Sequence, residues 1–204
     1  EDRSDTMSRL GSSSAADVHS DHTIQFVTPS GVASGETIVI TFPSDFDGTA
    51  VAYTDVDLLV DTTPDGTCDG TSQTLVTGAA SDGQWSVAFS GTENRTVTIT
   101  SGGATSVIGG GNEVCVKIGL NASGGAAQYI NPTTIDEYSI SITAGDDSGD
   151  IVVSIIENDV VFITAKVNET ITFSISDYDI GFGVLTPANA RFATGTEPYG
   201  ADGP

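Results

Sequence analysis

Residues 36–42 read Glu36-Thr37-Ile38-Val39-Ile40-Thr41-Phe42, with Ile38, Ile40 and Phe42 on every second position. A period of two places alternate side chains on one face of a β-strand. The threonines between them also favour strands, because they are branched at Cβ. Pro43 cannot donate a hydrogen bond to a sheet and ends the run. This stretch therefore predicts a strand with one buried face.

The same alternation recurs along the chain between turns rich in Gly, Pro, Asn and Asp. Many short strands separated by turn signals are typical of a sandwich or barrel. We therefore expect an all-β fold, an Ig-like or jelly-roll-type antiparallel β-sandwich with extended terminal segments and with Trp85 at the centre of its core. The apolar residues that mark the predicted strands are Ile24, Phe26, Val51, Tyr53, Val56, Leu58, Val60, Val87, Phe89, Val97, Ile99, Val114, Val116, Ile118, Tyr138, Ile140 and Ile142.

The 204 residues suffice for one such domain with additional segments. Residues 1–20 are polar and Ser-rich and predict a flexible N-terminal arm with one helical turn. We expect the sandwich over residues 21–168, an extended C-terminal strand over 169–185 and a flexible tail over 186–204. Within the sandwich, residues 146–149 predict a turn. The apolar runs 151–156 and 160–167 predict a hairpin that is buried on both faces or covered at its edge.

The charge balance excludes two classes of partner. Asp and Glu number 28 against 6 Lys and Arg, which gives a formal net charge of -22. Such a surface repels nucleic acids and anionic lipid headgroups, and favours cation-rich surroundings that screen self-repulsion. No apolar run reaches the ~18 residues of a membrane span. The chain begins at Glu1 rather than Met, which predicts a removed leader and an extracellular or cell-surface location.

Cys68 and Cys115 are the only cysteines and predict one disulfide in an oxidising compartment; two free thiols are the alternative. Cys115 alternates with Val114 and Val116, so its side chain should point away from the core. The bridge would then hold the turn-rich stretch around Cys68 against the outer face of a sheet. This placement differs from the core-spanning bridge of antibody domains.

Catalytic chemistry has little support. The only histidines, His19 and His22, lie at the junction of the arm and the first strand, where a solvated or structural role is favoured. Neighbouring carboxylates are numerous enough to arise by chance in so acidic a chain. We therefore expect no enzyme activity and no catalytic residues.

Calcium is the one cofactor that we consider, because it binds carboxylate and carbonyl oxygens on loops. The candidate ligands cluster around one strand and the loop after it, and simple solvated turns are the alternative reading. They are Asp55, Asp57, Asp61, Asp65 and Asp69.

Three Asn-X-Ser/Thr triplets begin at Asn94, Asn121 and Asn168. They are candidate glycosylation sites, although a chain this rich in Ser and Thr forms such triplets by accident.

Residues 170–176 alternate strictly, with Ile171, Phe173 and Ile175 separated by hydroxyl residues, and a second series continues through Ile180 and Phe182. Some 15 extended residues would span roughly 50 Å, which exceeds an ordinary sandwich strand. One domain does not easily accommodate such a segment.

Residues 21–38 (DHTIQFVTPSGVASGETI) and 172–176 (TFSIS), with GFGVL at 181–185 and ARFATG at 190–195, resemble secreted β-rich surface proteins of candidate-phylum (Patescibacteria-like) bacteria. In such proteins the second stretch opens a further β domain, whereas here the chain stops soon after it. The resemblance implies an extracellular filament or pilus-type subunit.

We expect residues 169–185 to complete the sheet of the next copy, with Ile171, Phe173, Ile175, Ile180 and Phe182 as anchors, and so build a head-to-tail homopolymer. Alternatives are donation of the N-terminal segment, a surface-layer protein, or a monomeric surface adhesin that binds a glycan or another surface ligand.

Overall fold

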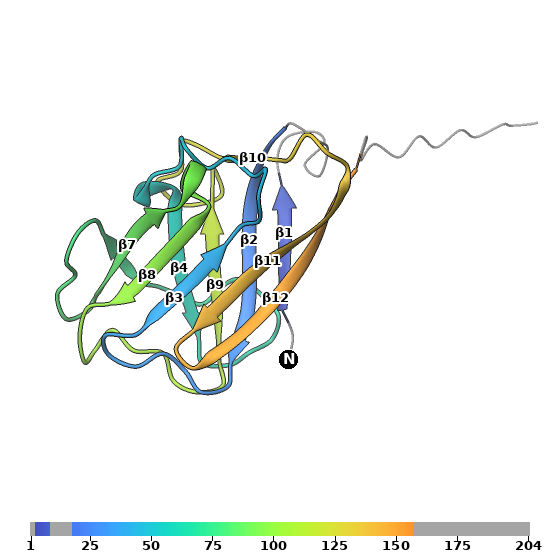
Figure 1. The fold of residues 1–204 in the computed structure, drawn as a ribbon. Coiled ribbons are helices and arrows are strands. Elements are labelled where there is room, and N and C mark those ends of the chain that lie inside the picture. Colours follow the sequence, from blue (N-terminus) through green and yellow to red (C-terminus); the bar gives the residue numbers. More distant parts are fainter. Residues whose placement is uncertain (1–2, 9–17, 157–204) are drawn as a thin grey trace, which may run out of the picture. The chain divides into compact units, whose positions relative to one another are not determined.

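The structure is a computed structural model that describes residues 3–8 and 18–156 (Figure 1). The described chain is built from strands, with two 3-10 helices, η1 (Tyr53–Asp55) and η2 (Thr92–Asn94). The strands are β1 (Arg3–Ser8), β2 (His19–Thr28), β3 (Thr37–Thr41), β4 (Val56–Asp61), β5 (Thr71–Ser72), β6 (Thr74–Val76), β7 (Gln84–Ser90), β8 (Thr96–Ser101), β9 (Asn112–Ile118), β10 (Tyr129–Ile130), β11 (Asp136–Ala144) and β12 (Asp147–Ile155).

These strands form two sheets. Sheet 1 has the order β1-β2-β9-β4-β5, with β10 paired to the start of β2, and sheet 2 has the order β12-β11-β3-β8-β7-β6. The predicted all-β sandwich is confirmed. One pair departs from the expected antiparallel pattern, because β6 runs parallel to β7.

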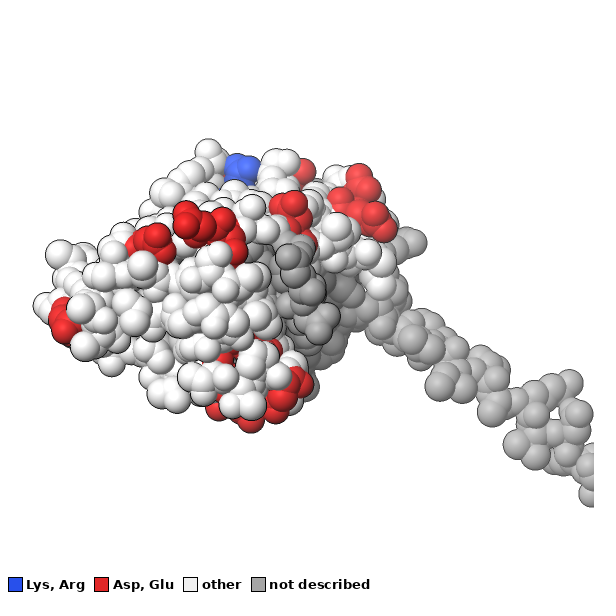
Figure 2. Space-filling model, turned by 90° about the horizontal axis from the view of Figure 1, so that it is seen from below, with Lys and Arg blue, Asp and Glu red and all other residues white. Residues whose placement is uncertain are grey.

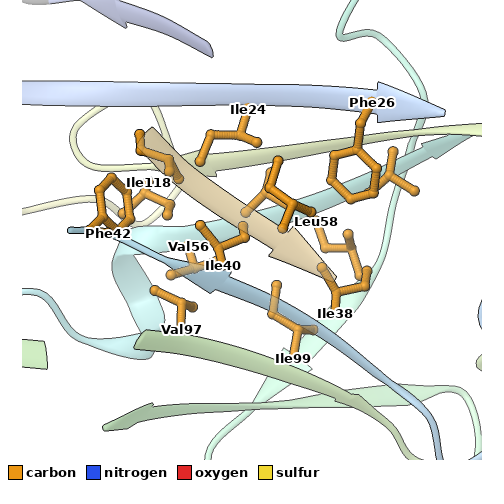
Figure 3. Packing of buried hydrophobic residues seen from close by; sticks show 14 of the residues in the cluster. Ile24, Phe26, Ile38, Ile40, Phe42, Val56, Leu58, Val97, Ile99 and Ile118 are labelled. Atoms are coloured by element: carbon orange, nitrogen blue, oxygen red, sulfur yellow. The ribbon is translucent and has the colours of Figure 1, made fainter. Parts of the chain in front are cut away.

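The hydrophobic core lies between the two sheets. Figure 3 shows Ile24 and Phe26 of β2 on one side of this core, and Ile38 and Ile40 of β3 on the other. Each large aliphatic or aromatic side chain buried in this way contributes about 1.5–3 kcal/mol to folding. The largest fully buried side chains are Trp85, Tyr129, Phe42, Phe46, Ile24, Ile38, Ile40, Leu58, Ile99, Ile118, Ile140 and Ile155.

The period-two prediction holds in the register of the strands. In the β3–β8 pair, Ile38 lies opposite Ile99, and Thr37 lies opposite Thr100. Both isoleucines are fully buried, whereas the threonines are partly exposed. Trp85 is buried as well, but β7 is next to the last strand of sheet 2. It therefore lies toward one end of the core rather than at its centre.

The N-terminal segment differs from the expected arm with a helical turn. Arg3–Ser8 forms the extended strand β1, which pairs antiparallel with β2, and β2 begins at His19. Polar sequence without a period of two gives no local signal for a strand. Pairing with β2 satisfies backbone N–H and C=O groups along that edge, and this is a tertiary effect.

The hairpin near residue 147 also differs from the prediction. The turn lies at Gly145 and Asp146, and Asp147, which was expected within it, already begins β12. Gly145 has φ 55°, a left-handed conformation that glycine adopts without steric cost. β12 pairs with β11 and is buried on one face only, because Val152 is 61% exposed. Residues 160–167 lie outside the described residues.

Candidate functional site

Both sheets end in an edge strand on the same side of the sandwich. β1 is the outermost strand of sheet 1 and β12 the outermost strand of sheet 2, and the two lie close together (Figure 1). An edge strand presents backbone donors and acceptors that another strand can pair with. This side, which we call the open side, is the candidate assembly site.

On the open side, β12 has few of the features that protect natural sheet edges. It is nine residues long, and the sequence Asp-Ser-Gly-Asp-Ile-Val-Val-Ser-Ile contains neither Pro nor Lys. Its carboxylates, Asp147 and Asp150, lie in its first half. Among the described residues β12 has no strand partner other than β11. A long regular edge of this kind is suited to strand addition.

β1 pairs with β2 in a register that places two charged residues and one methionine opposite buried residues of β2. Arg3 lies opposite Phe26, Asp5 opposite Ile24 and Met7 opposite His22. Phe26 is 4% exposed, and Ile24 and His22 are fully buried.

A pocket opens between the sheets beside the start of β1. It is lined by Phe26 and Val27 of β2, by Ile142 and Ala144 of β11, and by the first residues of β12. Because Arg3 is the register partner of Phe26, the pocket lies near the N-terminal end of β1. The pocket also borders Asp147, Ser148 and Gly149, so its lining is part polar and part apolar.

The residues predicted to carry polymerisation are Ile171, Phe173, Ile175, Ile180 and Phe182, and all of them lie outside the described residues. The expected donor strand over residues 169–185 therefore stays a prediction. The structure describes the open side of the sandwich, with β1 and β12 at the sheet edges.

The predicted disulfide is present, and it joins Cys68 to Cys115 with Cα atoms 5.6 Å apart. Cys115 shares the outer face of β9 with Glu113 and Lys117, while Val114 and Val116 belong to the core. Cys115 is nevertheless only 3% exposed. The loop that carries Cys68 is thus held against sheet 1, as expected.

Glu113 holds the same loop and was not singled out from the sequence. Its carboxylate is 4% exposed and accepts hydrogen bonds from the backbone N–H groups of Asp65 (3.0 Å) and Gly66 (3.2 Å), and from the side chain of Gln25. The available signal was its position two residues before Cys115, on the same outer face of the strand.

Three of the five candidate calcium ligands come together. The carboxylates of Asp61, Asp65 and Asp69 each offer an oxygen, and these atoms lie within 4.8 Å of one another. Hydrogen bonds from the hydroxyl and backbone N–H of Thr67 hold the pKa of Asp65 below its ordinary value. The group can supply hard oxygen ligands of the kind that calcium prefers.

Asp55 and Asp57 lie elsewhere and hold the loop 119–127 instead. Asp55 is buried and accepts hydrogen bonds from the backbone N–H groups of Ala126 (2.6 Å) and Ala127 (3.2 Å). Asp57 accepts from the backbone N–H (2.7 Å) and hydroxyl (3.0 Å) of Ser123. Both carboxylates are therefore structural groups in this fold.

The two histidines have different surroundings. His19 is exposed, whereas His22 is fully buried. The ring of His22 packs edge-on against Phe42 at 4.9 Å and Tyr129 at 5.9 Å between ring centroids. The Ser20 hydroxyl lies 3.3 Å from its Nε2 atom. This is a packed polar group within the core, in keeping with the structural reading.

Two of the three glycosylation candidates lie in the described region, and both use their amide nitrogen within the domain. The Nδ2 atom of Asn121 donates to the carbonyl of His22 (3.0 Å) and the hydroxyl of Thr23 (2.8 Å). The Nδ2 atom of Asn94 lies 3.4 Å from the carbonyl of Gly48. A glycan on either nitrogen would take one of its two N–H groups. Asn168 lies outside the described residues.

The surface reflects the composition. On the face drawn in Figure 2, acidic side chains form several patches and far outnumber basic ones, in line with 28 acidic against 6 basic residues in the chain. Among residues 3–8 and 18–156, no helix has the length and apolar character needed to cross a membrane.

Comparisons with known proteins give few matches. No protein-family model matches the chain, and no curated protein matches it. Among solved structures, it is similar to BslA, described as a bacterial hydrophobin, with a TM-score of 0.42 and 14% sequence identity over 76% of this chain and 96% of the other.

Proposed function

We propose that this chain is a non-enzymatic structural subunit of an extracellular, pilus-like filament that polymerises head to tail by strand donation. The observation that carries the proposal is the open side of the sandwich. There, β1 and β12 end the two sheets next to each other, and β12 offers nine residues of edge without Pro or Lys.

Residues 169–185 have the sequence expected of the donated strand. Ile171, Phe173 and Ile175 alternate with Thr172 and Ser174, and the segment contains no Lys or Arg. An extended segment of this kind can hydrogen-bond along a sheet edge while its alternate side chains enter the core. Contact between a donor at one end and an acceptor at another surface is heterologous and therefore produces fibres.

Two further features support an extracellular filament whose assembly depends on cations. The disulfide between Cys68 and Cys115 suits an oxidising, extracellular compartment. The net charge of -22 makes copies repel each other at low ionic strength, so assembly should require salt or divalent cations.

The test uses the full chain and two matched variants. Phe173→Asp places a charge on the apolar face of the donor, and Ser174→Asp places the same charge on its polar face. Light scattering and negative-stain electron microscopy should show fibres for the parent and for Ser174→Asp, and a 20.8 kDa monomer for Phe173→Asp.

Several outcomes would contradict the proposal. A parent that stays monomeric in salt would favour the monomeric adhesin, and flat arrays in place of fibres would favour the surface-layer protein. Fibres of Phe173→Asp that match the parent would remove residues 169–185 from the contact.

A further inference from the structure

We propose that β1 is a placeholder strand at the edge of β2, and that residues 171–175 of a second copy displace it during assembly. The inference rests on the proposed function and deepens it. Of the two sheets that end at the open side, it selects sheet 1 rather than the β12 edge of sheet 2 as the acceptor, and it names the strand that first occupies that edge.

The evidence is a contrast between the two neighbours of β2. On one side, β9 places Val114 opposite Phe26, Val116 opposite Ile24 and Ile118 opposite His22. All three β9 residues are fully buried, and each extends the core. The β9 side of β2 is therefore an ordinary apolar sandwich contact.

On the other side, β1 places Arg3, Asp5 and Met7 opposite these same residues of β2. Directly paired residues of an antiparallel ladder lie on the same face of the sheet. The face of β2 that carries Phe26 and Ile24 is the buried one, so β1 has two charged residues at register positions on the core-facing side. Charged residues opposite buried apolar ones add no apolar burial to the contact, so the β1–β2 pair should be weaker than the β2–β9 pair.

The second copy supplies a strand that matches this edge. In the orientation of β1, Ile171, Phe173 and Ile175 would take the register positions of Arg3, Asp5 and Met7. An apolar residue at the first position would lie beside the pocket that Phe26, Ile142 and Ala144 line. The exchange replaces two charged partners of buried residues with apolar ones, which is favourable.

The seam between the sheets is accessible to such an exchange. β1 lies next to β12 at the open side, and it pairs with β2 over six residues only. Strand exchange therefore need not disturb β9, β4 or the core that they cover.

The experiment strengthens β1 in the full chain. The double variant Arg3→Val and Asp5→Val makes β1 apolar at the core-facing positions and should hold it in place. Assembly should slow on the order of tenfold or more, and the unfolding temperature of the monomer should rise. The control, Ser4→Val with Thr6→Val, changes register positions opposite Gln25 and Thr23 on the outer face and should assemble at the parental rate.

A second variant acts in the opposite direction. Removal of residues 1–8 empties the β2 edge, so assembly should start sooner than in the parent. If this variant fails to fold, as judged by circular dichroism, hydrogen exchange of the parent replaces it: the amides of residues 3–8 should be protected in the monomer and exchange freely in the fibre. Persistent protection of residues 3–8 in fibres would overturn the inference.

The two proposals can fail separately. If Phe173→Asp abolishes fibres but the Arg3/Asp5 variant assembles at the parental rate, strand donation stands and β1 is not the strand displaced. If residues 3–8 lose protection at a rate independent of concentration and no fibre forms, residues 171–175 of the same copy have displaced β1. That result overturns both proposals.

Discussion

The outer faces of the two sheets are built differently. On sheet 1, loops are fastened to the strands by the disulfide of Cys115, by the buried carboxylate of Glu113, and by Asp55 and Asp57. On sheet 2, the outward residues of β3, β8 and β11 are mainly Thr and Ser, and no described loop crosses them in Figure 1.

This difference shows that the side-chain contacts between distant parts of the sequence gather on the outer face of sheet 1. The loop fastenings of sheet 1 join residues far apart in the sequence, such as Asp57 and Ser123, so their loss should loosen the loops of sheet 1. The outer face of sheet 2 instead consists of the polar residues that alternate with buried ones along each strand. Single substitutions there should change the free energy of unfolding only slightly. The following predictions test this contrast.

The largest effect should come from the disulfide. Replacement of both Cys68 and Cys115 by Ser removes a link between residues 47 positions apart. A loop of this length corresponds to about 4 kcal/mol in the free energy of unfolding. Denaturant titration should measure this loss, and hydrogen exchange should place the new mobility in residues 62–73. A loss of protection centred on β8 and β11 would contradict the contrast.

Glu113→Ala should have the next largest effect. It leaves the N–H groups of Asp65 and Gly66 without their carboxylate acceptor, which costs about 2–3 kcal/mol. Thr98→Ala on the outer face of sheet 2 is the matched control and should change stability by less than about 0.5 kcal/mol. Equal losses in the two variants would mean that the outer faces do not differ in this way.

Tyr129→Phe tests a contact between the sheets. The Tyr129 ring stacks on Phe42 at 4.2 Å, and its hydroxyl donates to the carbonyl of Asn94 at 2.5 Å. Loss of this hydrogen bond should cost about 1–2 kcal/mol near neutral pH. Thermal melts of the variant and the parent would measure the difference.

The same variant has a defined pH dependence. Burial, followed by the nearby charge of Asp47, raises the pKa of Tyr129 above its ordinary value of 10.0. A raised pKa in the folded state means that the contribution is complete below pH 10 and is lost as the pH rises further. The difference between parent and Tyr129→Phe should therefore shrink above pH 10. A constant difference would contradict this cause.

Calcium should have the smallest effect. If Asp61, Asp65 and Asp69 bind the ion, calcium at several times its dissociation constant should add about 1 kcal/mol to the free energy of unfolding. A chelator should reverse the gain, and Asp69→Asn should abolish it while Asp146→Asn should not. An identical melting temperature with calcium and with chelator would contradict the prediction.

Much of the fold could be predicted from local pattern. The alternation in residues 36–42, 95–100 and 137–143 identified buried side chains such as Ile40, Ile99 and Ile140, because the period of two is a property of each strand alone. The disulfide was predictable because only two cysteines are present. Of the calcium candidates, Asp61, Asp65 and Asp69 meet around one loop.

Other features had no local signal. Arg3–Ser8 has no alternation, and its role as a strand depends on the edge of β2. The roles of Asp55 and Asp57 depend on residues 123–127, which lie far away in the sequence. From the sequence alone, Glu113 is indistinguishable from an exposed acidic residue. In the structure the loop around Asp65 covers it.

The sequence by itself determined the all-β class, the inward face of most core strands and the pairing of its two cysteines, because these follow from local periodicity and from the cysteine count. Only the tertiary structure decided which strands lie at the edges of the two sheets, and that β1 and β12 lie together at the open side. Strand order and register arise from long-range pairing between segments, and no property of one segment specifies its neighbours.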